Sequence, residues 1–199
     1  MLIKRLFDIG CAGIGLLVLS PLLLVLALII KITSPGPVFF RQTRVGMKQK
    51  QFQIHKFRTM VVDAEKKGIK ITVGRDPRIT AIGGLLRKTK LDELPQLLDV
   101  VIGDMSLVGP RPEVPEYVKY YPPEVAALIF SVRPGITDWA SIKMIDENQL
   151  LAKSANPETA YIEQILPEKL GYAVKYVKTR TLFLDIRLIF LTIIKIFTR

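Results

Sequence analysis

Residues 9–30 read IGCAGIGLLVLSPLLLVLALII and carry no charged side chain. As a straight helix this segment would extend about 33 Å, close to the hydrocarbon core of a bilayer at about 30 Å. Ser20-Pro21 lies near its middle, and a proline inside a helix removes one hydrogen-bond donor and bends or breaks the helix. In lipid the freed carbonyl groups need another donor, which Ser20 can supply. The segment therefore predicts membrane association.

The flanking charges leave two membrane topologies open. Lys4 and Arg5 precede the apolar segment, while Lys31, Arg41 and Arg44 follow it. Because basic flanks are retained in the cytoplasm, charges at both ends favour a re-entrant hairpin that enters and leaves by one face. The length of the segment favours a kinked helix that crosses once. We expect no cleaved signal peptide, because the apolar run is too long and no small-x-small motif follows it.

The remaining composition indicates a cytosolic domain that binds anions. The 199 residues carry a net charge of +11, and they include one cysteine and one histidine, which exclude an intrachain disulfide and a multi-histidine zinc site. Residues 41–90 hold 14 lysines and arginines against three acids and so account for the whole excess. Such a block attracts nucleic acid, anionic lipid or phosphorylated substrates. A solvated basic surface is the alternative.

The hydrophobic pattern predicts a mainly helical α+β fold with a membrane unit at residues 1–34 and a cytosolic domain at residues 35–199. Polar and apolar residues mostly alternate at residues 51–58, which predicts a strand, and a second short strand is expected at 38–42. Residues 181–197 are too charged to span and predict an amphipathic helix in the membrane interface. Further helices are expected at residues 79–90, from residue 91 through Val101, and at residues 147–153. Two more are expected at residues 116–130, interrupted at Pro122-Pro123, and at residues 158–176, with a break or kink at Pro167.

Residues 91–112, LDELPQLLDVVIGDMSLVGPRP, contain the adjacent acids Asp92 and Glu93 near an expected helix start. The positive end of a helix lowers carboxylate pKa values, so both acids are expected to be ionised. An ionised aspartate suits a nucleophile or a metal ligand, and a carboxylate pair suits Mg²⁺. The alternative is that the two acids only stabilise the helix. Its apolar stripe (Leu91, Leu94, Leu98, Val101) is expected to be buried, and its polar face (Asp92, Gln96, Asp99) to lie opposite.

Three basic residues are candidates for phosphate binding. Arg111 lies between two prolines in GPRP, which restrict its backbone, and a guanidinium fork suits bidentate phosphate contacts. Its alternative role is to cap a loop. Lys56 and Arg58 lie on the strand expected at 51–58, where they would bind phosphate, contact a lipid headgroup or simply be solvated.

Asp185 is an acid inside the apolar helix expected at 181–197. A charge near a membrane needs a partner, so Asp185 is either a functional residue or one half of a salt bridge with Arg187 or Lys178.

Taken together, the motifs resemble the bacterial sugar transferase family, the small monotopic phosphoglycosyl transferases. The resemblance covers nearly the whole chain. It is carried by KFRTM at 56–60, DPRIT at 76–80, LDELPQ at 91–96, GDMS at 103–106, GPRP at 109–112 and RPGIT at 133–137. Any one of these motifs would be weak, but their order is specific.

The resemblance implies transfer of a sugar-1-phosphate from a UDP-sugar to polyprenol phosphate, with release of UMP. It implies a ping-pong route in which Asp92 attacks phosphorus to form an acyl-phosphate, Glu93 binds the Mg²⁺ cofactor, and Arg111 contacts phosphate. It adds Asp185 as an active-site aspartate. Further expected phosphate-binding residues are Lys56, Arg58, Arg78 and Arg133. The implied location is the cytoplasmic face of the bacterial inner membrane, with a re-entrant, monotopic helix broken at Ser20-Pro21.

One segment departs from the family pattern. Many members continue GWAQVNGR after the RPGIT motif, whereas this chain has DWASIKMIDE at residues 138–147, so the donor sugar stays open. A membrane-anchored basic module for nucleic acid or anionic lipid is the alternative function. The basic block has few interleaved aromatic residues for base stacking, so a nucleic-acid partner is not expected. A homodimer is compatible with the sequence.

Overall fold

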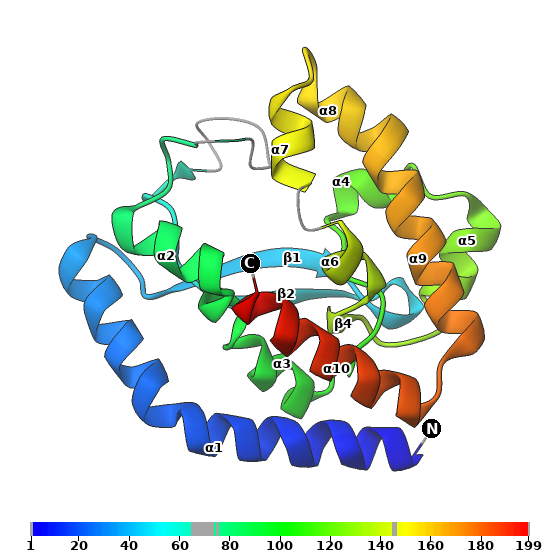
Figure 1. Ribbon diagram of the computed structural model, residues 1–199, viewed down its shortest axis with the longest axis horizontal. Helices are drawn as coiled ribbons and strands as arrows, with labels where there is room; N and C mark the ends of the chain where they lie inside the picture. The colour runs from blue at the N-terminus through cyan, green and yellow to red at the C-terminus, as the bar shows by residue number, and fades with distance from the viewer. Residues whose placement is uncertain (1, 65–73, 75, 145–146, 199) are drawn as a thin grey trace.

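The first helix, α1 (Leu2–Thr33), is bent, and the rest of the chain lies in the angle between its two arms (Figure 1). Pro21 lies inside the helix, and the Ser20 hydroxyl donates to the Leu17 carbonyl at 2.8 Å. In an unbroken helix the N–H of residue 21 would bind that same carbonyl. The prediction that Ser20 satisfies a carbonyl freed by Pro21 is confirmed.

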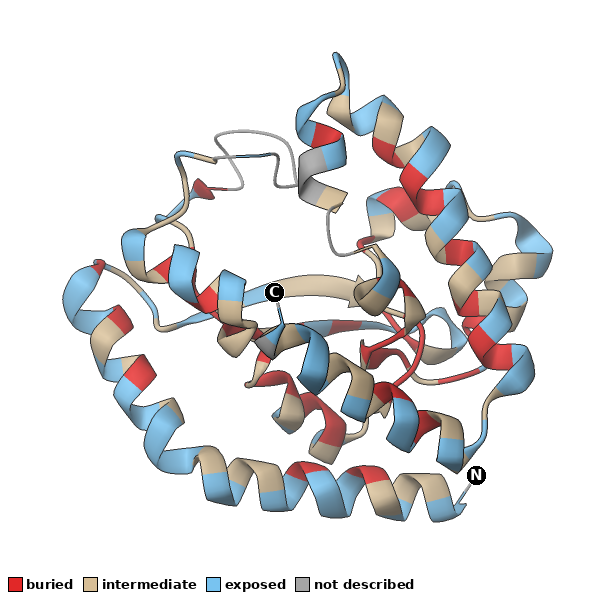
Figure 2. Cartoon of the chain, viewed as in Figure 1, coloured by how far each residue is buried: buried red, intermediate tan, exposed pale blue. Residues whose placement is uncertain are grey.

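The outer surface of α1 is apolar and open. Its most apolar 18-residue window is only 11% buried, and this helix is the one in the described part of the chain that is long and apolar enough to cross a membrane. Most of the ribbon of α1 is coloured as exposed or half-buried in Figure 2. Because large apolar surfaces in water are rare on soluble monomers, α1 indicates membrane association.

The N-terminal arm of α1 directs its charged residues at the rest of the molecule. Arg5 donates to the carbonyls of Val100 at 2.7 Å and Val101 at 3.2 Å, near the C-terminal end of α3 (Gln96–Ile102). A cation at this end of a helix satisfies free carbonyls and opposes the helix dipole. Asp8 is buried and accepts a hydrogen bond from the Ser106 hydroxyl at 2.8 Å. Polar contacts therefore join this arm to the domain.

The C-terminal arm joins the same domain through apolar packing. Leu26 and Ile30 are buried in a cluster with Phe57 of β2 (Gln51–Phe57) and Leu86 of α2 (Ala81–Thr89). Both arms thus contact one body.

This computed structural model describes residues 2–64, 74, 76–144 and 147–198. It confirms a mainly helical chain with small sheets. Strand β1 (Phe39–Val45) pairs with β2 in an antiparallel hairpin, and both lie where the sequence predicted strands. A second sheet pairs β3 (Ser106–Val108) with β4 (Gly135–Thr137) in parallel, which the sequence did not predict.

Short helices and two long ones complete the chain. The long helix α9 (Leu166–Thr179) contributes the buried residues Leu170 and Ala173 to the largest apolar cluster. The remaining elements are η1 (Met47–Gln49), η3 (Leu91–Glu93), α4 (Pro115–Val118), α5 (Pro123–Ile129), α6 (Trp139–Lys143), α7 (Glu147–Ala152), α8 (Pro157–Ala160), the π-helix η4 (Tyr161–Ile165), α9 (Leu166–Thr179) and α10 (Leu182–Phe197).

The burial expected for α3 is wrong. Gln96 and Asp99, assigned to its polar face, are 2% and 1% exposed, whereas Leu98 is 41% exposed. The physical reason is that this face of α3 packs toward β2, where Asp99 binds the backbone N–H and the ring nitrogen of His55.

Candidate active site

Asp92 and Glu93 lie in a 3-10 turn directly before a helix. Lys90 adopts the left-handed conformation (φ 59°) at the end of α2, and the chain then turns through η3 before α3 begins at Gln96. The expected position of the two acids close to a helix start is confirmed. Both side chains are buried, at 7% and 8% exposure.

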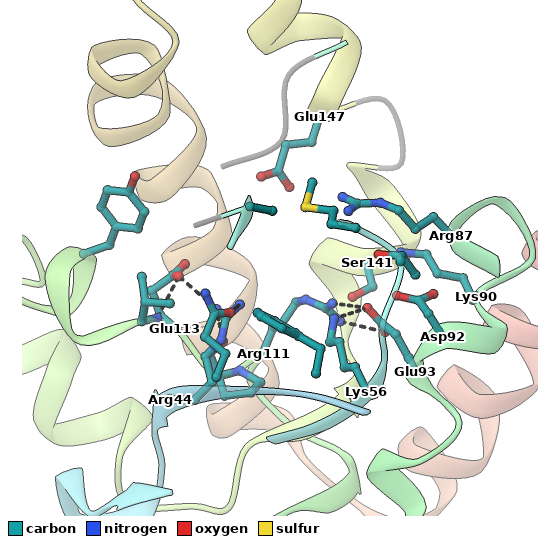
Figure 3. A pocket seen from close by; sticks show the side chains of 18 of the residues that line it. Arg44, Lys56, Arg87, Lys90, Asp92, Glu93, Arg111, Glu113, Ser141 and Glu147 are labelled. Atoms are coloured by element: carbon teal, nitrogen blue, oxygen red, sulfur yellow. Dashed lines mark hydrogen bonds and ion pairs between the residues drawn. The ribbon is translucent and has the colours of Figure 1, made fainter. Parts of the chain in front are cut away.

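Glu93 lies between two cations that come from different parts of the chain. Lys56 on β2 donates to Glu93 Oε1 at 2.8 Å. Arg111 donates through both terminal nitrogens, with Nη1 at 3.2 Å from Oε2 and Nη2 bonded to Oε1. Figure 3 shows Lys56, Arg111 and Glu93 meeting beside Asp92. Lys56, Asp92, Glu93 and Arg111 are called the phosphate cluster below.

The GPRP turn is held by close backbone packing. A Cβ on Gly135 would lie 2.0 Å from the Gly109 nitrogen, so only glycine fits there. Gly109 N–H donates to the Thr137 carbonyl at 3.1 Å, and Gly135 N–H donates to the Pro110 carbonyl at 3.0 Å. The GPRP turn and the neighbouring strand β4 therefore hold each other in place, and the guanidinium of Arg111 is positioned toward Glu93.

The two acids are affected by burial in different ways. Burial raises the pKa of Asp92, and the nearby charge of Lys56 only partly opposes this. Burial also acts on Glu93, but Arg111 and Lys56 outweigh it and hold the pKa of Glu93 well below its usual value. The expectation of lowered pKa values for both acids is thus wrong for Asp92. Its Oδ1 atom is buried and, among the described residues, has no hydrogen-bond partner.

The phosphate cluster lines one part of a pocket with a volume of about 920 Å³. A second polar group lines the same pocket. There Glu113 accepts from Arg44 at 3.3 Å and from the Tyr161 hydroxyl, and Lys169 lies 2.8 Å from Glu147. Figure 3 shows Arg44 and Glu113 across the pocket from Asp92, with Glu147 between the two groups. Such a volume is in the usual range for small-molecule sites.

The sequence did not single out these residues of the second group. Glu113 directly follows the GPRP motif, so its proximity to Arg111 in the chain was a usable signal. Tyr161 and Lys169 lie 48 and 56 positions further along, and their spacing carries no signal of this contact.

Arg58 and Arg78 line the pocket, but their guanidinium groups bind the protein. Arg58 is buried and donates to the carbonyls of Ser34 and Pro35, each at 2.7 Å. Arg78 pairs with Asp76 at 2.6 Å. In this structure Arg58 therefore fastens the chain after α1 to β2, and Arg78 braces its own loop.

Asp185 and Arg133 are placed away from the phosphate cluster, and the described residues that line the pocket include neither. Asp185 is 1% exposed and binds Lys4 of α1 at 2.6 Å and the Tyr176 hydroxyl at 2.7 Å. Arg133 donates to the Gly103 carbonyl at 2.8 Å. Phosphate contacts of Asp185 and Arg133 therefore stay predictions. The salt-bridge partner of Asp185 is Lys4 of α1, whereas Arg187 or Lys178 was expected.

The pattern of motifs and the site geometry can be compared with known proteins. A family model described as bacterial sugar transferase matches residues 1–199. The chain belongs to the bacterial sugar transferase family. The resemblance drawn from the ordered motifs is confirmed.

Individual relatives of this sugar transferase are similar along nearly all of its length. It is 38% identical to the UDP-glucose:undecaprenyl-phosphate glucose-1-phosphate transferase of Escherichia coli, over 98% of this chain and 40% of that protein. The same identity relates it to the UDP-N-acetylgalactosamine-undecaprenyl-phosphate N-acetylgalactosaminephosphotransferase of Aeromonas hydrophila, over 98% and 44%. The exopolysaccharide production protein PSS of Rhizobium leguminosarum is also 38% identical, over 100% and 97%. The chain thus spans less than half of the first two relatives.

The departing segment at 138–147 lies beside the phosphate cluster. Residues 145 and 146 are outside the described residues, but Asp138, Ser141, Met144 and Glu147 all line the large pocket. Asp138 begins α6 by accepting from the Ser141 N–H at 2.8 Å. The segment in which this sugar transferase differs from the expected pattern therefore borders the site itself.

Proposed function

We propose that this protein transfers a sugar-1-phosphate from a UDP-sugar to polyprenol phosphate and releases UMP, in the first membrane step of glycoconjugate synthesis. The observation that carries the proposal is the phosphate cluster. In it, a buried carboxylate oxygen that has no hydrogen-bond partner among the described residues lies beside a carboxylate neutralised by two cations. The reactions named for the relatives in Escherichia coli and Aeromonas hydrophila support it.

In the proposed first step, an Asp92 carboxylate oxygen attacks the phosphorus that carries the sugar. A P–O bond forms to Asp92, the P–O bond to UMP breaks, and UMP leaves with the bonding electron pair. In the second step a phosphate oxygen of polyprenol phosphate attacks the same phosphorus and frees the Asp92 carboxylate. Burial suits this role, because a desolvated carboxylate with a raised pKa is more basic than an exposed one.

Arg111 and Lys56 are proposed to bind the diphosphate of the donor. Both cations form ion pairs with Glu93, which holds them in position before the donor phosphate binds. Arg111 is suited to bidentate contacts, while Lys56 acts as a point charge. Positioned charges of this kind stabilise the negative charge that develops during phosphoryl transfer.

The residues at this site fit Mg²⁺. The buried Oδ1 of Asp92 lacks a hydrogen-bond partner among the described residues, and Glu93 adds a second carboxylate. No cluster of three or more metal-binding side chains occurs in the described part of the chain. Mg²⁺ is commonly bound through one or two carboxylates together with substrate phosphate and water. We propose that Glu93 holds the ion, which when bound neutralises charge on the diphosphate.

We propose that α1 is re-entrant and that residues 35–199 form a catalytic domain on the cytoplasmic face of the bacterial inner membrane. The support is that both arms contact this domain: Lys4 binds Asp185, Arg5 binds the end of α3, and Leu26 and Ile30 pack on Phe57. A helix that crossed the bilayer would carry one arm away from these contacts.

Cysteine labelling tests the topology. In a Cys11→Ser background, single cysteines introduced by Leu2→Cys, Ile32→Cys and Lys119→Cys occupy exposed positions near the two ends of α1 and on the domain. We expect an impermeant thiol reagent to label all three from the same side of sealed membrane vesicles. Labelling of Leu2→Cys from the side opposite to Lys119→Cys would contradict the re-entrant helix.

A donor screen tests the proposed reaction. Membranes that contain the protein are incubated with polyprenol phosphate, Mg²⁺ and each of several UDP-sugars, and UMP release is measured. We expect one donor or a small set to give UMP together with a lipid-linked sugar. The alternative basic binding module would instead bind nucleic acid or anionic vesicles in a salt-sensitive way and consume no UDP-sugar. The cations of the phosphate cluster are directed at carboxylates in a pocket, which favours the enzyme.

A further inference from the structure

A second cavity opens from the phosphate cluster toward α10. It has a volume of about 150 Å³. Its walls include Glu93 and Arg111, and it also shares Lys88, Lys90 and Ser141 with the large pocket. The two cavities therefore border the same charged group, but they differ in their other walls.

The remaining walls of the small cavity are mostly apolar and belong to three segments of the chain. They comprise Leu94, Leu97, Ile136, Ile142 and Ile196, all of them half-buried. A Cβ on Gly15 of α1 would lie 3.3 Å from the Leu97 side chain, so this wall touches the membrane helix. We call this cavity the apolar groove.

Helix α10 covers the apolar groove and is apolar on its outer face as well. Thr192, Lys195 and Ile196 face the groove from adjacent turns, and Thr192 forms a hydrogen bond with Thr137 of β4 at 2.6 Å. The outer face of the same helix exposes Phe183, Ile186, Phe190, Ile193 and Ile194. Such a helix suits the membrane interface. The groove thus lies between a lipid-facing surface and the phosphate cluster.

The charges around the apolar groove are complementary to a phosphate. Lys88, Lys90 and Lys195 lie on its lining together with Arg111, against a single carboxylate, Glu93. A ligand that satisfies both the cations and the apolar walls must be an amphiphile with an anionic head and a hydrocarbon chain. A UDP-sugar lacks such a chain.

We infer that the apolar groove receives the first part of the isoprenoid chain of polyprenol phosphate and places its phosphate at Lys90 and Arg111, beside Asp92. This inference rests on the proposed function and assigns the acceptor its own entrance. An apolar cavity of about 150 Å³ can hold a group as large as benzene, which is comparable in size to one five-carbon isoprene unit. The rest of the chain continues along the apolar surfaces of α1 and α10. The donor then uses the large pocket, so the two substrates need not share a path.

Filling the apolar groove tests this inference. In Ile196→Trp the larger side chain takes the space of the proposed isoprenoid, and Ile193→Trp is the matched control, because Ile193 lies on the outer face of the same helix. Two quantities are measured: the burst of UMP from the UDP-sugar without acceptor, and the KM for polyprenol phosphate. We expect Ile196→Trp to keep the burst and raise this KM roughly 10-fold or more. We expect Ile193→Trp to leave both unchanged.

A second variant guards against misfolding. Ile142→Trp fills the apolar groove from the opposite wall, so it is expected to raise the same KM and keep the UMP burst. An unchanged acceptor KM in folded Ile196→Trp and Ile142→Trp would overturn the inference, as would an equal rise with Ile193→Trp. If the unmodified protein gave no UMP with any donor, the proposed function itself would fail, which is a distinct result.

Discussion

Replacing Asp92 with asparagine is expected to lower UMP release by at least about 10³-fold, because an amide cannot act as the nucleophile. Asp92 is 7% exposed, and burial raises its pKa, so the ionised side chain lowers the stability of the folded protein. Asparagine removes the charge and keeps the shape. The variant should therefore keep its melting temperature or gain slightly while it loses activity, as expected for a residue retained for function.

Asp99→Asn is the matched control for this substitution. Asp99 is also a buried aspartate, 1% exposed, but it lies outside the pocket and accepts from the backbone N–H of His55 at 2.9 Å and from its ring nitrogen. We expect this variant to melt earlier and to keep UMP release within about 10-fold, since the disturbed hydrogen-bonded pair is buried and does not line the pocket.

Kinetics and thermal melts of the two variants together separate the roles. If Asp92→Asn kept normal turnover, or if radiolabelled sugar phosphate stayed attached to that variant, Asp92 would not be the nucleophile. Equal losses of activity in both variants would indicate a general effect on folding.

Features that depend on neighbouring residues could be predicted from the sequence. Ser20-Pro21 predicted both the bend in α1 and the hydrogen bond that compensates for it, because the donor is adjacent to the proline. Asp92, Glu93 and Arg111 were recognised because each lies in a short motif. The alternation at residues 51–58 gave the strand that carries Lys56. These signals are all local.

Features that depend on distant contacts could not be predicted. Asp185 was expected to need a partner, but the partner is Lys4, 181 positions away on the membrane helix. The raised pKa of Asp92 follows from burial by several segments, and a helix-dipole argument from the sequence gave the opposite direction. The burial of the polar face of α3 was missed because hydrophobic patterning does not show that Asp99 binds His55 on a distant strand.

The pair formed by Arg111 and Glu93 gives the second large effect. Arg111→Ala leaves Glu93, which is 8% exposed, with Lys56 as its ion-pair partner among the described residues. Loss of one partner of a buried charge costs about 1–3 kcal/mol of stability. Loss of a positioned cation in phosphoryl transfer costs about 10²-fold or more in rate. We therefore expect both a lower melting temperature and a rate of UMP release reduced by at least this factor.

The double variant Arg111→Ala/Glu93→Gln separates these two losses. Removing the carboxylate charge should restore only part of the melting temperature, since the introduced glutamine is neutral but Lys56 then loses its ion-pair partner. It should not restore UMP release, because the proposed phosphate clamp and Mg²⁺ ligand are both absent. Arg111→Lys should lie between the unmodified protein and Arg111→Ala, because it keeps the charge but loses the bidentate fork. Recovery of activity in the double variant would mean that Arg111 serves only to neutralise Glu93, and the donor diphosphate would then need another cation, with Lys56 the nearest described candidate.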